Sequence, residues 1–227
     1  MKRAKLTVDI AMAVLLPLLM AYSLIGEAFH EIIGTAMLAL GVAHHVLNRR
    51  WFAALRKGKY NPRRIFQTAL DVLLIAVLLL QPLSGIAMSK HLYTFLPALP
   101  LSAAAREIHM LCAYWGFVLM SLHAGTHLLP VAAKLKKQKG LLPVTCLVAA
   151  AVSICGVYAF IKRGFPGYMA GTSKFAFFDY DEPPVWFLLD HLAVMALFMA
   201  VGAVLAAGLA GKHMKSPTES ITRRMIP

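Results

Sequence analysis

Hydrophobic residues in this chain gather in six long runs separated by short polar connectors. The runs cover residues 6–25, 28–47, 66–88, 104–128, 142–161 and 185–209. Each has close to the twenty residues that a helix needs to cross a hydrocarbon core about 30 Å thick, at about 1.5 Å per residue. No useful stretch alternates apolar and polar positions with the period of two that indicates a strand. The pattern predicts an all-α integral membrane protein with a bundle of six transmembrane helices.

The composition agrees with that prediction. Hydrophobic residues make up 59% of the 227 positions and charged residues 15%, and the mean hydropathy is +0.69. A soluble domain carries about a quarter charged residues, so both a water-soluble globule and a disordered chain are excluded. The three cysteines lie inside apolar runs without a CxxC pair, which disfavours a disulfide framework, a thiolate metal site and covalent haem attachment.

The formal net charge of +13 is explained by membrane orientation. If six runs cross, 18 of the 23 Lys and Arg residues lie on one side; the other five are Lys90, Arg106, Lys162, Arg163 and Lys174. The positive-inside rule then predicts that both termini are cytoplasmic, and no nucleic-acid partner is needed. The basic start followed by residues 10–20 also suits a cleaved signal peptide. However, Asp9 interrupts the run and no clear small-residue cleavage site precedes Glu27, so we expect the first span to be retained.

Four of the nine histidines repeat one spacing. His30 and His44 lie in the second run, and His109 and His123 lie in the fourth, and the members of each pair are 14 positions apart. At about 100° and 1.5 Å per residue, each pair shares one helix face and spans about 21 Å. Both runs cross in the same direction, so side-by-side packing would set His30 level with His109 and His44 level with His123.

That arrangement predicts two stacked b-type haems, each held by one imidazole from each helix, within a four-helix core over residues 1–130. Haem needs axial ligands and a dry slot, and ionisable residues at membrane depth are functional candidates by default. Interhelical hydrogen bonding would explain one such histidine, but less readily two pairs of identical spacing. Gly34, Gly41 and Gly116 would let a porphyrin approach the backbone, although small residues also serve ordinary helix packing in membranes.

Neighbouring polar residues leave alternatives open. His45 and His127 are alternative ligands, but they lie less well in phase or in depth than His44 and His123, and we expect them at the interface. Arg106, three residues before His109, would pair with a haem propionate.

Two acidic residues lie inside the cytoplasmic ends of their runs. Asp9 and Asp71 would take up protons from a quinone or pair near the headgroups with Arg63, Arg64 or Lys5, and we favour the ion pairs. Two further helices over residues 131–211 follow the core, with an extracytoplasmic loop at 162–184 and a cytoplasmic tail at 212–227.

Several segments resemble the flavinylation-associated cytochrome family of bacterial membrane proteins. They are LLMAYSLIGEAFHEIIG, HHVLNRRWFAALRKGKYNPRR, SGIAMS, HMLCAYWGFVLMSLHAGTH and FFDYDEPP, which lie between residues 18 and 184. The resemblance extends over nearly the whole chain. The resemblance implies a multi-pass cytochrome b of the bacterial cytoplasmic membrane, with His30, His44, His109 and His123 as haem ligands. It also implies electron transfer between a quinone pool and an extracytoplasmic flavin-carrying protein, here a separate chain.

The leading function is therefore electron transfer through two haem b groups, as a cytochrome subunit rather than a stand-alone enzyme. One alternative is a quinol- or metal-oxidoreductase with its own substrate site, for which Asp9, Asp71 or His191 would be the residues to test. The other is a haem-free proton or metal transporter, although no run is clearly broken in its middle by paired Gly and Pro as transporter helices often are.

Overall fold

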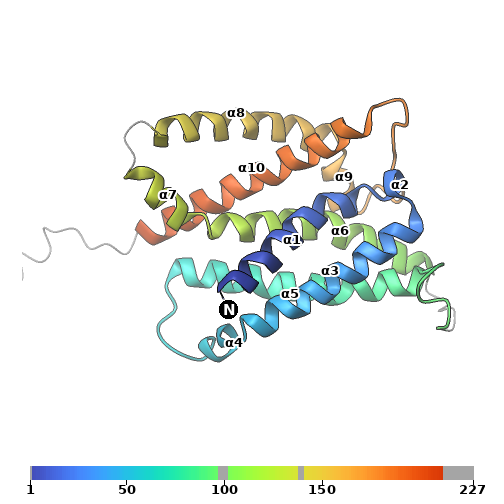
Figure 1. The fold of residues 1–227 in the computed structure, drawn as a ribbon, viewed down its shortest axis with the longest axis horizontal. Coiled ribbons are helices and arrows are strands. Elements are labelled where there is room, and N and C mark those ends of the chain that lie inside the picture. Colours follow the sequence, from blue (N-terminus) through green and yellow to red (C-terminus); the bar gives the residue numbers. More distant parts are fainter. Residues whose placement is uncertain (1, 97–101, 138–140, 212–227) are drawn as a thin grey trace, which may run out of the picture.

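The computed structural model describes residues 2–96, 102–137 and 141–211, and within these residues the chain is helical and has no strand (Figure 1). The predicted tail at 212–227 lies outside the described residues. The helices are α1 (Lys2–Met20), α2 (Tyr22–Ile25), α3 (Glu27–Leu47), α4 (Arg50–Ala54), α5 (Pro62–Met88), α6 (Ser102–Thr126), α7 (Leu129–Lys136), α8 (Leu141–Lys162), α9 (Phe165–Met169) and α10 (Pro184–Gly211).

Five of the six apolar runs each coincide with one long helix, whereas the run at 6–25 is divided between α1 and the short α2. Four of the helices are long and apolar enough to cross a membrane. The four candidate spans are Pro62–Met88, Ala103–Lys134, Pro143–Lys162 and Pro184–Ala210. Their outward side chains are apolar, as lipid contact requires: Leu147, Ile154 and Val204 are 73%, 72% and 70% exposed. The chain is therefore a membrane protein. Helices α1 and α3 are not among these four candidates: α1 begins with several charged residues, and α3 contains two glutamates and three histidines.

Local sequence explains where several helices begin. Gly26 adopts a φ of 85° and separates α2 from α3, and Gly164 at 68° separates α8 from α9. Side chains rarely tolerate such positive φ values, which glycine adopts without cost. Asn61 caps α5 by accepting the backbone N–H of Arg64, and Pro62 occupies the first helical position, a favourable combination for a helix start.

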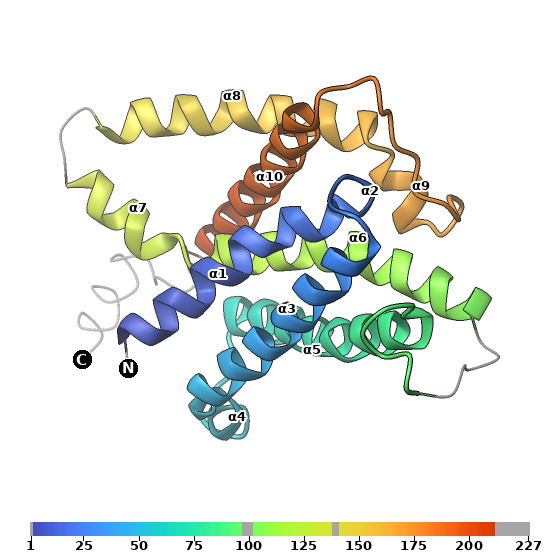
Figure 2. The same ribbon diagram turned by 45° about the vertical axis from the view of Figure 1, so that its right-hand side comes forward.

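Helix α6 is the centre of the bundle. It packs along α5 on one side and α10 on the other, α10 packs on α8, and α1 packs on α3. Figures 1 and 2 both show α8 and α10 on one side of α6, with α3 and α5 on the other. The close contact between α6 and α10 requires glycine at two positions. A Cβ on Gly125 would lie 2.1 Å from the carbonyl oxygen of Met199, and a Cβ on Gly202 would lie 2.2 Å from that of Leu122.

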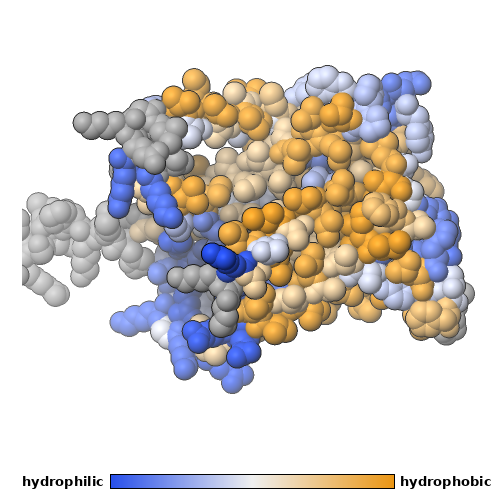
Figure 3. Space-filling view, viewed as in Figure 1, coloured by the Kyte–Doolittle hydropathy of each residue, from blue (hydrophilic) through white to orange (hydrophobic). Residues whose placement is uncertain are grey.

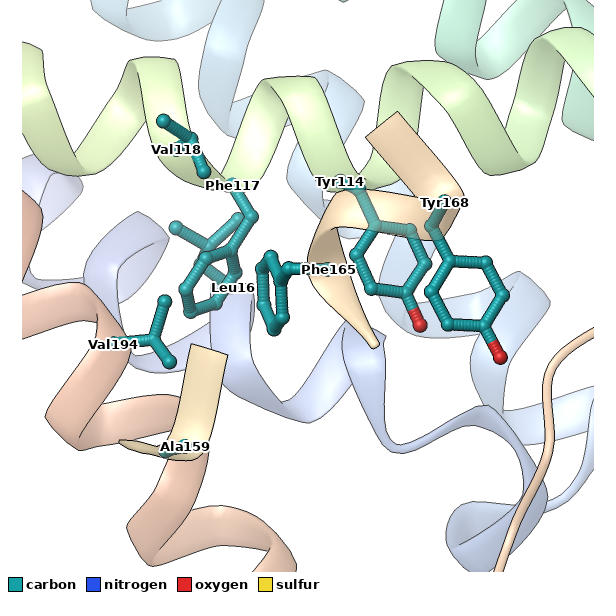
Figure 4. Close-up of a cluster of buried hydrophobic side chains, with 8 residues drawn as sticks. All are labelled: Leu16, Tyr114, Phe117, Val118, Ala159, Phe165, Tyr168 and Val194. Carbon is teal, nitrogen blue, oxygen red and sulfur yellow. The ribbon is translucent and has the colours of Figure 1, made fainter. Parts of the chain in front are cut away.

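The main hydrophobic cluster lies on one face of α6 (Figure 4). Tyr114 stacks on Tyr168 with ring centroids 4.2 Å apart and meets Phe165 edge-on at 4.9 Å. The other members of the cluster are Leu16, Phe117, Val118, Ala159 and Val194. At about 100° per residue, this face of α6 points largely away from the face that bears His109 and His123. One side of α6 is thus fixed in the core, and the other is free to hold a site.

The long helices run between two ends of different charge. Figure 3 shows hydrophobic residues over the middle of the molecule and hydrophilic residues at its two ends. We call the end with the start of α1, the α3–α5 connection and α7 the basic end. Its described cations include Arg3, Lys5, Arg49, Arg50, Arg56, Lys57, Lys59, Arg63, Arg64, Lys134 and Lys137.

The opposite end is held together by ion pairs. Lys162 and Arg163, at the end of α8, both contact Glu182 in the loop and Asp190 in α10. The hydrogen bond from Lys162 lowers the pKa of the Glu182 carboxyl, and Arg163 adds to the effect. This network ties the predicted extracytoplasmic loop to the ends of α8 and α10.

Candidate functional site

Two pairs of histidines face one another between α3 and α6. Both helices are continuous through their histidines, so His30 and His44, like His109 and His123, are separated by about 21 Å along the helix. The structure brings together His30 with His109, and His44 with His123. Both contacts predicted from the spacing are therefore present. We call His44 and His123 the basic-end pair, and His30 and His109 the opposite-end pair.

In the opposite-end pair the ring centroids of His30 and His109 lie 6.1 Å apart at an interplanar angle of 67°. Helix α5 positions His109. The Nδ1 atom of His109 lies 3.2 Å from the carbonyl oxygen of Gln81 and 3.2 Å from Ser84 Oγ, while Nε2 lies 3.1 Å from the Gln81 side-chain nitrogen. If Nδ1 donates its proton to the carbonyl oxygen, the Nε2 lone pair accepts from the Gln81 amide in this structure, and it would bind a metal once that amide moves aside.

His30 is held differently from His109. The edge of its ring meets Tyr22 with centroids 5.3 Å apart. Its Nδ1 atom is buried and has no hydrogen-bond partner. A buried nitrogen without a partner costs free energy, and no hydrogen bond fixes this side of the ring as the Gln81 carbonyl fixes that of His109.

In the basic-end pair the centroids of His44 and His123 lie 6.5 Å apart at 76°. Each ring has a carboxylate on its other side. His44 Nδ1 lies 2.8 Å from Asp9 Oδ1, and His123 Nδ1 lies 2.8 Å from Asp71 Oδ1. The neighbours come from α1 and α5, the two helices that flank α3 and α6. With Nδ1 occupied, Nε2 of each ring is the nitrogen left for a ligand role.

The prediction that these two carboxylates form ion pairs with nearby Lys and Arg residues was wrong. Neither Asp9 nor Asp71 pairs with Lys5 or with an arginine of the α3–α5 connection; both pair with a histidine. Lys5 instead donates to the side-chain oxygen of Asn48 at 2.7 Å. The cation nearest to Asp9 in the sequence therefore serves the end of α3.

The alternative ligands lie beside the pairs rather than across from them. His45 Nδ1 lies 2.7 Å from the carbonyl oxygen of Gly41, one turn earlier in its own helix, and its ring is 5.6 Å from His44. The His127 ring lies 4.8 Å from that of its own helix neighbour His123. The contacts from α3 to α6 are made by His44 and His123, which favours these two as the ligand pair.

The separation of the rings suits two ligands of one metal. An imidazole nitrogen binds a transition-metal ion at about 2.0–2.1 Å, so two rings on opposite sides of one ion have centroids about 6 Å apart. Both pairs meet this condition. Among the described residues no group of three or more His, Cys, Asp and Glu side chains could hold a metal ion. Two imidazoles suit an iron that takes its other ligands from a porphyrin, as haem iron does.

The glycines expected near a porphyrin lie at helix contacts. A Cβ on Gly41 would meet a methyl of Leu78 at 2.7 Å, one on Gly116 would meet Val77 at 2.9 Å, and one on Gly34 would lie 3.9 Å from Leu19. The first two face α5 and the third faces α1. The glycine that contacts a candidate ligand is Gly85, which the sequence did not single out: its Cβ would lie 3.2 Å from His109 Cε1.

Arg106 and His191 have other neighbours in this structure. The Arg106 guanidinium lies over the Phe175 ring, 5.7 Å from its centroid. His191 is buried in the aromatic core; its Nδ1 lies 2.9 Å from the Phe187 carbonyl oxygen, and its ring lies 4.1 Å from that of Phe187 at a tilt of 31°. These contacts give His191 a packing role.

A cavity of about 210 Å³ opens beside the basic-end pair. His123 and Asp71 form part of its wall. The other lining residues are Trp51, Ala54, Leu55, Arg64, Gln67, Thr68, Thr126 and His127. The wall therefore combines an indole ring and aliphatic groups with several hydrogen-bonding side chains, directly next to a candidate metal ligand.

Comparison with known proteins adds no family to these observations. No protein-family model matches the chain, and no curated protein or solved structure matches it.

Proposed function

We propose that this chain is a di-haem b-type membrane cytochrome that relays electrons across the bilayer. The observation that carries the proposal is the meeting of two imidazole pairs from α3 and α6, with ring centroids 6.1 and 6.5 Å apart and about 21 Å between the pairs. One imidazole contact has a simple structural explanation. Two such contacts, at matched heights on the same two helices, favour two equivalent cofactor sites.

The chain's own residues perform three tasks in this proposal. The Nε2 atoms of the four histidines hold two haem groups, whose iron supplies one-electron redox chemistry when bound. Asp9, Asp71 and the Gln81 carbonyl fix the Nδ1 sides of three rings, which sets the tautomer and the ring orientation. The apolar helices around the pairs exclude water and lower the local dielectric.

The proposed topology has six spans, with α1 and α3 crossing beside the four more apolar helices. Both are long enough: 19 and 21 residues at about 1.5 Å each give about 30 Å. The positive-inside rule makes the basic end cytoplasmic. The sequence resemblance supports a bacterial cytoplasmic membrane and an extracytoplasmic, flavin-carrying electron partner.

A quinone is the proposed partner at the basic end. The cavity beside His123 offers aliphatic and indole surface to a ring, and hydroxyl, amide and carboxylate groups to its oxygens. This cavity also supports a second candidate function, a quinol oxidoreductase with its own substrate site. Reduction of the haem by added quinol, in protein free of other subunits, would favour that second function over a relay that exchanges electrons with proteins only.

A reduced-minus-oxidised absorption spectrum with a haem-to-protein ratio tests the proposal. We expect a b-type spectrum and about two haems per chain, one for each histidine pair. His109→Ala and His123→Ala should each leave one haem. His45→Ala is the matched control, because it removes an imidazole adjacent to His44 on the same helix, and should leave two.

The result that would refute the proposal is equally direct. Absence of haem from folded protein that was produced with haem available would exclude a cytochrome. An unchanged haem ratio in His109→Ala would show that this residue is not a ligand. Loss of one haem in His45→Ala would move the ligand role to that residue.

A further inference from the structure

The two imidazole pairs differ in the charge of their hydrogen-bond partners. At the basic end, both Nδ1 atoms lie 2.8 Å from a carboxylate oxygen, of Asp9 for His44 and of Asp71 for His123. At the opposite end, His109 Nδ1 has only neutral oxygens, each at 3.2 Å, and His30 Nδ1 is buried without a partner. The two sites are thus alike in their ligands and unlike in the groups behind them.

This difference acts on the iron through the imidazole. A ligating histidine that donates its Nδ1–H to a carboxylate is a more basic ligand at Nε2 than one bonded to a neutral oxygen. A more basic ligand stabilises the oxidised, more positive iron, and the nearby negative charge acts in the same direction. Hydrogen bonding behind the ligand is one of the means by which a protein sets a haem potential.

We infer that Asp9 and Asp71 are positioning residues that give the basic-end centre a lower reduction potential than the opposite-end centre. The inference rests on the proposed function, because it concerns the same four histidines. Each electron that moves then oxidises the basic-end centre and reduces the opposite-end centre. The favourable direction runs from the cytoplasmic side outward, toward the proposed extracytoplasmic partner.

The cations of the basic end act in the opposite direction but more weakly. A positive field favours the reduced iron, and more than ten Lys and Arg residues lie at this end. Most belong to exposed connectors, where water and salt screen them beyond about 10 Å. Arg64 shares the cavity wall with Asp71 and His123, but its guanidinium donates to the carbonyl oxygens of Ala54 and Lys59 and not to either carboxylate. Lys5, near Asp9 in the sequence, donates to Asn48. Two carboxylates in direct contact with the ligand rings therefore outweigh them.

A spectroelectrochemical titration of the full-length haem-loaded protein tests the inference. We expect two midpoint potentials. The His109→Ala variant, which retains only the basic-end centre, should show the lower one. Asp71→Asn should raise that potential by at least about 59 mV. For one electron this is a tenfold increase in the ratio of reduced to oxidised haem at a fixed electrode potential. The higher potential should not move.

Further variants separate an electronic effect from damage to the fold. Asp9→Asn should shift the same potential in the same direction. Asp71→Glu keeps a carboxylate and should stay closer to the unmodified protein than Asp71→Asn. Asp181→Asn, in the loop at the opposite end and without a hydrogen bond or ion pair to any of the four histidines, is the matched control and should shift neither potential.

The outcomes distinguish this inference from the proposed function. Protein without haem overturns the proposed function. Two haems with equal potentials, or a lower potential that belongs to the opposite-end centre, overturn the inference alone. An unchanged lower potential in both Asp9→Asn and Asp71→Asn does the same.

Discussion

Gly85 gives a way to disturb the opposite-end pair without removing a ligand. A Cβ at this position would lie 3.2 Å from Cε1 and 3.5 Å from Nδ1 of His109. Carbon atoms without a bond between them settle at about 3.5–4.0 Å, so alanine would displace the ring by about 0.3 Å. Leucine places another carbon about 1.5 Å further along, and would displace the ring by more than about 1 Å.

These displacements compare directly with what a metal bond tolerates. Ligand distances in metal sites hold to about 0.2 Å, so the shift caused by alanine slightly exceeds this limit and the shift caused by leucine far exceeds it. We expect Gly85→Ala to weaken haem binding at His30 and His109, and Gly85→Leu to abolish it. The other pair lies about 21 Å away along the helices and should keep its haem. Overpacking itself should cost about 1–3 kcal/mol of stability.

The assay is the haem-to-protein ratio of each purified variant, with its reduced-minus-oxidised spectrum. The ratio should be two for the unmodified chain and one for Gly85→Leu. Gly208→Leu is the control, since a Cβ there meets no atom within 4 Å. Far-ultraviolet circular dichroism and the retained haem report that the fold is intact. Folded Gly85→Leu protein that keeps two haems would refute the assigned position of His109 against α5.

Two further predictions concern the fold. Gly125→Ala should lower the thermal unfolding temperature in detergent markedly, because its Cβ would lie 2.1 Å from the Met199 carbonyl oxygen. The control Gly208→Ala should be neutral or slightly stabilising. Equal unfolding temperatures of the two variants would contradict the close α6–α10 contact. The hydrogen bond from Lys162 lowers the pKa of Glu182 below its usual 4.5, so its stabilisation is complete above pH 4.5 and is lost as the pH falls through the lowered value. Amide hydrogen exchange in residues 170–184, corrected for intrinsic rates, should therefore accelerate only below that pH, and acceleration between about pH 5 and 7 would contradict the role of this ion pair.

The histidine pairs were predictable because their geometry is local. A spacing of 14 residues fixes both the angle and the rise between two side chains once the segment is helical, and α3 and α6 are unbroken over His30–His44 and His109–His123. The remaining condition is that the two helices face each other at the same height. The assumption that successive apolar runs cross the membrane in alternate directions supplied that condition, without any knowledge of crossing angles.

The groups behind the imidazoles were not predictable in the same way. Gln81, Ser84 and Gly85 reach His109 from α5, and only the packing angle between α5 and α6 decides which turn of α5 lies there. Apolar periodicity cannot supply that angle, because lipid-facing and buried positions are both apolar in a membrane helix. The same property explains Gly41 and Gly116, which prove to contact α5 side chains.

The depth of Asp9 and Asp71 in their apolar runs indicates histidine partners, but the expectation of ion pairs with nearby cations obscured this signal. Each lies inside an apolar run at the depth of His44 and His123, whereas the lysines and arginines of the basic end lie outside the apolar runs. Long basic side chains extend toward water from such positions, but the short carboxylate of aspartate cannot. A charge that stays at depth is costly unless a donor at the same depth pairs with it.

The charge distribution of the basic end supports that reasoning. Among the described residues, Asp9 and Asp71 are the only acidic side chains at this end, and both bond a histidine although many cations lie nearby. Imidazole N–H groups are the donors available at their depth. The carboxylates are therefore best explained by the rings they hold, and not by neutralisation of the basic connectors. In the proposed topology, membrane orientation accounts for the cations of this end, and the histidine pair accounts for its anions.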